Sequence, residues 1–155
     1  QLTRNAWADM DVYLKQRAEL IPNLVTAVKA YASHEQSLLE AVAAARAHAL
    51  QLKEPTPEKA AVEQQVSNKV GQMFILAEAY PDLKASENFM KLQDDLRSTE
   101  KMIAGARQYY NACVRDFNTK IEAFPSSIVA GMLGAKHEEF FELDSATERQ
   151  APSVS

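Results

Sequence analysis

Residues 89–124 read FMKLQDDLRSTEKMIAGARQYYNACVRDFNTKIEAF, and this stretch decides the fold. Apolar side chains recur in it at every seventh position: Phe89, Leu96, Ile103, Tyr110, Phe117 and Phe124. A second row drifts by one place along the chain, because a straight helix has 3.6 rather than 3.5 residues per turn; it comprises Leu92, Thr99, Ala106 and Cys113, followed by Val114 and Ile121. The spacing predicts a single helix of about 36 residues that ends before Pro125.

The N-terminal stretch repeats this periodicity. One row holds Trp7, Leu14, Ile21 and Val28, and the other holds Met10, Leu24 and Tyr31. Pro22 lies inside the pattern, but the heptad phase is the same before and after it. We therefore expect one helix with a kink at Pro22 rather than a reversal of the chain.

A second helix is expected after this one. Ser33 and Gln36 have the spacing of a capping box, in which the two side chains satisfy the free backbone groups at a helix start. The alanine-rich periodicity that follows continues to Leu52.

A third helix is expected after a short loop. Thr56 can cap its N-terminus, with Pro57 at the first helical position, where a proline costs nothing. The helix stops at Pro81, and either Asp82 or Ser86 starts the long helix described first.

Residues Ser127 to Leu133 form a short apolar stretch bounded by Gly134, and from Lys136 onward the helical phase is lost. The sequence thus predicts an all-α fold, an elongated antiparallel bundle of four main helices plus a short C-terminal helix. We assign residues 1–135 to the bundle and 136–155 to a C-terminal tail.

Composition excludes several classes of protein. The 155 residues include only four glycines and six prolines, too few turn formers for a β-sandwich. The net charge of −4, with no strongly basic segment, argues against nucleic-acid binding. No apolar run approaches the ~20 residues of a membrane span. Cys113 is the only cysteine, and we expect it to fill space in the core.

No pattern of catalytic or metal-binding residues is present. The histidines, His34, His48 and His137, have neither the His-Glu-x-x-His spacing of zinc proteases nor the Glu-x-x-His spacing of di-iron bundles. We expect them to be ordinary surface or capping residues. Glycine-rich phosphate loops and nucleophile elbows are also missing from the sequence. The sequence therefore predicts no catalytic residues, no cofactor and no metal.

Arg17 occupies the inward-facing row of the first helix, where an apolar residue is expected. An unpaired buried guanidinium is costly, so Arg17 must reach a carboxylate or solvent. Glu100, beside the apolar row of the long helix, is the best candidate for its partner.

Glu100 begins a row of polar residues along the long helix that continues with Arg107, Asn111 and Asn118. We interpret this row as an interhelical polar network that fixes the register of the two long helices. A face that binds a partner is the alternative.

The turn around Tyr80 and Asp82 also allows two interpretations. In the first, Pro81 ends one helix, Asp82 or Ser86 begins the next, and Tyr80 with Leu83 covers the end of the bundle. In the second, the turn is a recognition loop on a rigid scaffold.

The chain resembles the LemA family over nearly its whole length. The matching blocks are Ala6-Trp7, Leu20-Ile21-Pro22-Asn23-Leu24-Val25, Tyr31-Ala32-Ser33-His34-Glu35, Glu78-Ala79-Tyr80-Pro81-Asp82-Leu83-Lys84-Ala85, Tyr110-Asn111 and Phe124-Pro125-Ser126. The resemblance implies a bacterial single-pass membrane protein whose N-terminal span precedes Gln1, with the helical domain on a side of the membrane that the sequence does not identify. It also implies no assigned enzymatic activity, and links to membrane metalloproteases, envelope maintenance or membrane remodelling.

Two functions follow as hypotheses. The first is a non-enzymatic, membrane-tethered scaffold or adaptor that binds a membrane protein partner, such as a metalloprotease, in the bacterial envelope. The second is a homotypic assembly module whose self-association organises or remodels the membrane.

Overall fold

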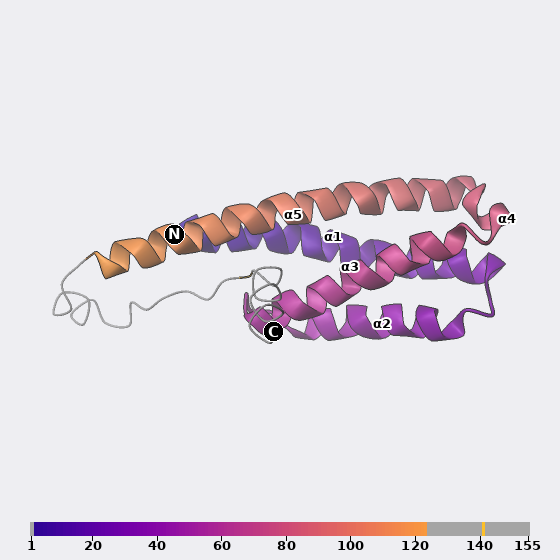
Figure 1. Ribbon diagram of the computed structural model, residues 1–155, viewed down its shortest axis with the longest axis horizontal. Coiled ribbons are helices and arrows are strands. Elements are labelled where there is room, and N and C mark those ends of the chain that lie inside the picture. The colour runs from indigo at the N-terminus through magenta and orange to yellow at the C-terminus, as the bar shows by residue number, and fades with distance from the viewer. Residues whose placement is uncertain (1, 124–140, 142–155) are drawn as a thin grey trace, which may run out of the picture.

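The computed structural model describes residues 2–123 and residue 141. They form four long helices and one short helix: α1 (Leu2–Tyr31), α2 (Gln36–Gln51), α3 (Pro57–Ala77), α4 (Pro81–Lys84) and α5 (Glu87–Glu122). The long helices run alternately up and down along one axis (Figure 1). This arrangement confirms the predicted all-α elongated bundle. The short helix expected at Ser127 to Leu133 and the tail from 136 lie outside the described residues.

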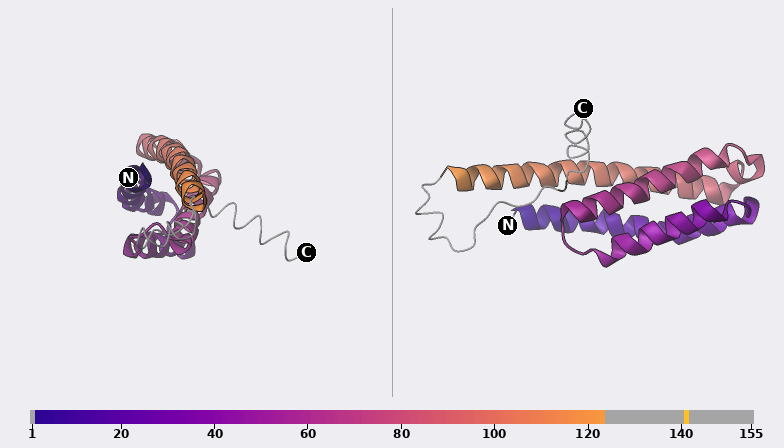
Figure 2. Two further views of the ribbon diagram at one scale, coloured as in Figure 1. Left: turned by 90° about the vertical axis from the view of Figure 1, so that its left-hand side faces the viewer. Right: turned by 60° about the horizontal axis from the view of Figure 1, so that its bottom comes forward.

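The two longest helices, α1 and α5, run along the length of the rod. α1 packs against α5 along one side and against α2 along the other, and α3 packs against α2. Seen from a second direction, α2 and α3 end short of the N-terminus of α1, and α5 extends beyond all three (Figure 2). Among the described helices, four lie at one end of the molecule, whereas α1 and α5 alone reach the other.

Two apolar clusters fill the interior. The larger cluster lies at the four-helix end and includes Leu24, Val28, Met73 and Phe89, each with no exposed surface. The smaller cluster lies where α1 and α5 pair; its buried members are Ala6, Met10, Leu14, Ala60, Ile103, Tyr110, Val114 and Phe141. The drift of the apolar row is visible in the burial: Val114 and Ile121 are buried, while Phe117 is 37% exposed.

Pro22 leaves α1 continuous, as expected from the unchanged heptad phase. Because proline has no N–H, the carbonyl of Ala18 loses its usual helical donor. Arg46 of α2 replaces that donor, with its Nε 2.5 Å from the Ala18 oxygen. This replacement joins α2 to the one point of α1 where the helical hydrogen-bond ladder is interrupted.

The predicted start of α3 at Thr56 is confirmed. Of the two residues predicted to start α5, Asp82 and Ser86, it is Ser86 that caps the helix. Thr56 accepts a hydrogen bond from the Lys59 backbone, with Pro57 in the first turn, and Ser86 accepts one from the Phe89 backbone. Residues Pro81–Lys84 instead form the separate helix α4.

The capping box predicted at Ser33 is wrong. Helix α2 begins at Gln36 after Glu35, with no side-chain capping hydrogen bond. The Gln36 side chain donates to Glu40, one turn later, rather than reaching back to the helix start. The Glu35 side chain is itself engaged by Tyr80, so a tertiary contact competes with local capping here.

The two serines give a matched test of helix capping. Ser86→Ala should lower the free energy of unfolding by about 1 kcal/mol, because the Phe89 N–H loses its acceptor. Ser33→Ala should change it by less than about 0.5 kcal/mol, the range of ordinary surface substitutions. Urea unfolding followed by circular dichroism measures both, and equal losses would contradict the assignment of the cap.

Candidate functional site

A layer of buried charged and polar side chains separates the two apolar clusters. On α1, Arg17 lies between Leu14 of one cluster and Ile21 of the other; Glu63 and Glu100 hold equivalent positions on α3 and α5. We call this group the charged layer; it consists of Arg17, Lys59, Glu63, Ser67 and Glu100. Three helices therefore meet through ionic contacts in the middle of the rod.

Arg17 is the centre of the charged layer. Its side chain is 1% exposed, and its Nη1 lies 2.8 Å from Glu100 Oε2, which confirms the predicted pair. The same nitrogen donates to Ser67 Oγ at 2.5 Å, and Ser67 in turn donates to Glu100 at 2.9 Å. Arg17 Nη2 lies 2.5 Å from Glu63 Oε1 and 3.1 Å from the Glu63 backbone oxygen.

Glu63 is the partner that sequence analysis missed. Its second carboxylate oxygen lies 2.7 Å from Lys59 Nζ, and Lys59 also donates to the Ala49 carbonyl at 2.9 Å. Both side chains are buried, with 9% and 5% of their surface exposed. The sequence did contain a signal for this pair. Lys59 and Glu63 are four residues apart and share the inward face of α3 with Val66 and Val70.

The geometry links the charged layer to the alignment of the helices. Among the described residues, no buried side-chain nitrogen or oxygen lacks a hydrogen-bond partner. A shift of one helix by a single turn, about 5.4 Å, would separate the ions and leave charges buried without partners. We infer that the charged layer fixes the register of α1, α3 and α5.

The remaining residues of the predicted polar row lie farther along α5. Arg107 is half-buried and Asn118 is buried. Asn111 has a different partner from the one expected, because its amide donates to the Phe141 carbonyl at 3.1 Å and accepts from the Phe141 N–H at 3.0 Å. A primary amide carries both a donor and an acceptor, so it can satisfy both backbone groups of one residue. Asn111 thus holds a residue beyond α5 rather than pairing with α1.

The contact at Asn111 places an aromatic ring on the smaller cluster. The ring of Phe141 lies 5.7 Å from that of Trp7, and Trp7 lies 6.1 Å from Tyr110 in an edge-on contact. Phe141 is 2% exposed. Residue 141 therefore belongs to the core at the two-helix end of the rod.

The turn between α3 and α5 closes the opposite end. Leu83 is fully buried, Tyr80 is half-buried, and Asp82 is exposed in the first turn of α4. Tyr80 donates its hydroxyl hydrogen to Glu35 Oε2 at 2.9 Å. This hydrogen bond raises the pKa of Tyr80 above its usual 10.0, with smaller contributions from desolvation and from the Glu35 charge. Tyr80 and Leu83 cover the bundle end as predicted; recognition by this turn stays a hypothesis.

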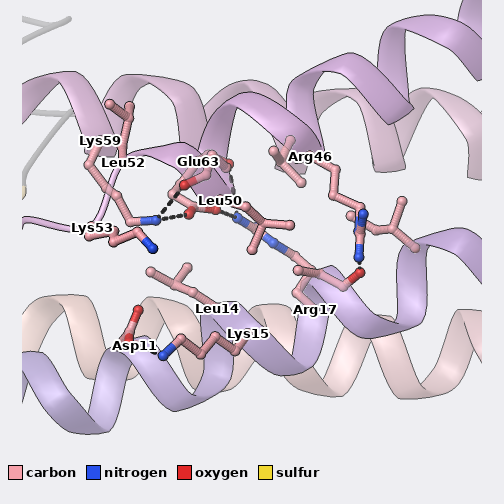
Figure 3. A pocket seen from close by; sticks show the side chains of 14 residues that line it. Asp11, Leu14, Lys15, Arg17, Arg46, Leu50, Leu52, Lys53, Lys59 and Glu63 are labelled. Carbon is pink, nitrogen blue, oxygen red and sulfur yellow. Dashed lines mark hydrogen bonds and ion pairs between the residues drawn. The ribbon is translucent and has the colours of Figure 1, made fainter.

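A pocket of 230 Å³ adjoins the charged layer between α1, α2 and α3. In the view of Figure 3, Lys53 and Lys59 are drawn at one end of the pocket, and Lys15 on α1 points toward Asp11, with which it pairs at 3.0 Å. Leu14, Leu50 and Leu52 supply apolar surface. The pocket therefore combines cationic and apolar walls.

A groove of 310 Å³ lies between α1 and α5, and its described lining residues all belong to these two helices. Its lining includes Ala6, Tyr13, Met102, Gly105, Ala106 and Tyr109. Met102 is 47% exposed and Tyr109 is 53% exposed. Methionine and tyrosine are enriched at surfaces that bind other proteins.

The described residues lack a metal-binding cluster and a helix that could cross a membrane. No group of three or more potential metal ligands occurs among them. His34 and His48 are exposed, as predicted, while His137 lies outside the described residues. Cys113 is half-buried against the smaller cluster. Within residues 2–123, no helix combines the length and apolar character of a membrane span.

The fold and the charged layer define the class of protein, an elongated all-α bundle organised around a pair of long helices. The chain belongs to the LemA family, whose model matches residues 6–155. It is 22% identical to the magnetosome protein MamQ 2 of Paramagnetospirillum magneticum, over 87% of this chain and 59% of that protein. It is also 22% identical to the protein LemA of Metamycoplasma hominis, over 90% of this chain and 64% of that protein. The chain thus spans less than two thirds of the length of these relatives.

The two glutamates of the charged layer should differ in their effect on stability. Glu63→Gln removes a buried carboxylate shared by two cations and should lower the free energy of unfolding by about 3 kcal/mol or more. Glu100→Gln should cost only about 1 kcal/mol, because its side chain is 29% exposed and water can solvate the change. Urea unfolding compares the two variants, and an equal cost would show that Glu63 is not the central carboxylate.

The Tyr80 contact predicts a dependence on alkaline pH. The fold favours the neutral phenol, so its contribution to stability is complete below pH 10 and is lost as the pH rises through the raised pKa of folded Tyr80. In Glu35→Gln, the pKa of Tyr80 should move down toward 10.0. NMR titration of the tyrosine rings measures it, with Glu40→Gln in the first turns of α2 as a control that should leave Tyr80 unchanged.

Proposed function

We propose that this domain is a non-enzymatic, membrane-tethered scaffold that binds a helix of a membrane protein partner in the groove between α1 and α5. The observation that carries the proposal is the groove itself, which lies on the longest helix pair and displays Met102 and Tyr109 to solvent. Family membership supports attachment to a membrane, and we propose that a segment outside the described residues supplies it.

The shape of the groove favours a helix as its occupant. Gly105 lies in the groove, and the Cβ of an alanine placed there would meet no atom within 4 Å. Ala106 beside it is also small, so the backbone of another helix can approach closely. Lys101 and Asp9 at the groove allow polar contacts at the border of an apolar helix face. An amphipathic helix, apolar where it meets Tyr13 and Met102, fits this lining.

The stiffness of the rod supports a scaffold. The buried ion pairs of the charged layer join three helices, and the four-helix end is closed by α4. A partner bound at the two-helix end would therefore be held at a defined distance from the opposite end. The described carboxylates of the charged layer are already bound to cations, which favours a structural role over catalysis.

The groove can be blocked without disturbing the fold. Gly105→Arg places a long side chain in the groove, and Gly71→Arg is the matched control on α3, where an added Cβ also meets nothing within 4 Å. With a photo-crosslinking residue at Tyr109 in the full-length membrane form, we expect one dominant membrane protein partner to be captured. Gly105→Arg should reduce that capture at least fivefold, whereas Gly71→Arg should not.

Three outcomes would contradict the proposal. Capture that persists in Gly105→Arg would place the contact elsewhere, and a crosslinker at Ile75, which is 72% exposed on α3, serves to locate it. Recovery of crosslinked copies of this chain alone would replace the scaffold with homotypic assembly. Full complementation of a deletion strain by a version without its membrane segment would remove the basis for the tether.

A further inference from the structure

The pocket beside the charged layer carries more positive charge than its surroundings. Five of its lining residues are cationic and two are acidic, although the chain as a whole has a net charge of −4. Both acids are already engaged: Glu63 pairs with Arg17 and Lys59, and Asp11 pairs with Lys15 at 3.0 Å. Glu100, outside the lining, also pairs with Arg17, so Lys53 and Arg46 are the two lining cations without a carboxylate partner among the described residues.

We propose that this pocket binds a small carboxylate with a short apolar tail, a site independent of the groove between α1 and α5. The carboxylate lies between Lys53 and Lys59, and the tail lies against the leucines of α1 and α2. This site goes beyond the scaffold function, because no residue that lines the pocket lines the groove.

The two lysines supply the donors for the anion. Lys59 is 5% exposed, and its two hydrogen-bond acceptors, Ala49 and Glu63, leave one of its three ammonium hydrogens for a further acceptor. Lys53 follows α2 and forms no ion pair with any described residue. Both lysines line this pocket, and in the view of Figure 3 their side chains are drawn at the same end of it. An oxyanion between them would accept charge-assisted hydrogen bonds from both.

The leucines that line the pocket favour a ligand with an apolar tail. Leu14, Leu50 and Leu52 lie beside the lysines (Figure 3), and Leu50 is 41% exposed, so a bound tail would remove apolar surface from water. A volume of 230 Å³ is below the usual range for drug-sized ligands. The size fits a chain of about eight carbons rather than a long lipid tail.

The test uses the 155-residue chain and sodium octanoate, with 1-octanol and sodium acetate as matched probes that lack the charge or the tail. Backbone amide NMR spectra should show saturable shifts at Leu50, Leu52 and Lys53 with octanoate. Octanol and acetate should bind at least tenfold more weakly. Equal affinity for octanol would overturn the role of the lysines, and shifts centred on the groove would overturn the location.

Variants separate the pocket from general surface charge. Lys53→Gln should weaken octanoate binding about tenfold, since it removes one of the two donors. Lys29→Gln, at an exposed position in the last turn of α1, should leave the affinity unchanged. Thermal unfolding midpoints verify that both variants are folded, and an equal effect of the two substitutions would contradict the proposal.

A final experiment tests whether the lysines bind a dissolved carboxylate or the anionic surface of a membrane. Vesicles of phosphatidylglycerol present anionic headgroups without a free carboxylate. If the chain binds these vesicles but shows no saturable shift with octanoate, the proposal is wrong and the lysines serve an anionic surface. Octanoate binding that is equally tight in the presence of vesicles supports the pocket.

Discussion

The burial of the Arg17 guanidinium is the constraint on which the rest of the structure depends. A guanidinium does not lose its proton in a protein, so a buried arginine must be neutralised by carboxylates. Glu63 comes from α3 and Glu100 from α5, while Arg17 lies on α1. The requirement to bring these three groups together sets the axial positions of three helices and divides the apolar core into two clusters.

The two ends of the rod differ because of this division. At the four-helix end, the larger cluster is enclosed by α1, α2, α3 and the first part of α5, and α4 closes the turn into α5. At the other end, the described residues that pack on α1 and α5 are Ala60 and Phe141, and a groove with exposed Met102 and Tyr109 lies between the two helices. The pocket lies near the middle, where the lysine that completes the charged layer also lines a cavity. The charged layer, the groove and the pocket thus occupy three different parts of one short chain.

Errors in the sequence analysis occur where a distant residue replaces a local partner. The spacing of Ser33 and Gln36 satisfies a local capping rule, but Tyr80, 45 residues away from Glu35, takes part in organising that helix start. Asn111 lies in the polar row of α5 that was predicted to align the two long helices. It instead binds the backbone of Phe141, 30 residues later. Both contacts depend on chain segments whose proximity no local pattern encodes.

The sequence by itself determined the helices, most of their ends and the need for a carboxylate at Arg17, because periodicity, capping and the cost of a buried charge are local properties. Only the tertiary structure decided that Glu63 shares Arg17 with Glu100, that Arg46 replaces the donor lost at Pro22, and where the pocket and groove lie. These features arise from the lateral packing of helices. Several helix arrangements satisfy the same apolar rows, and the choice among them is made by contacts between residues far apart in the chain.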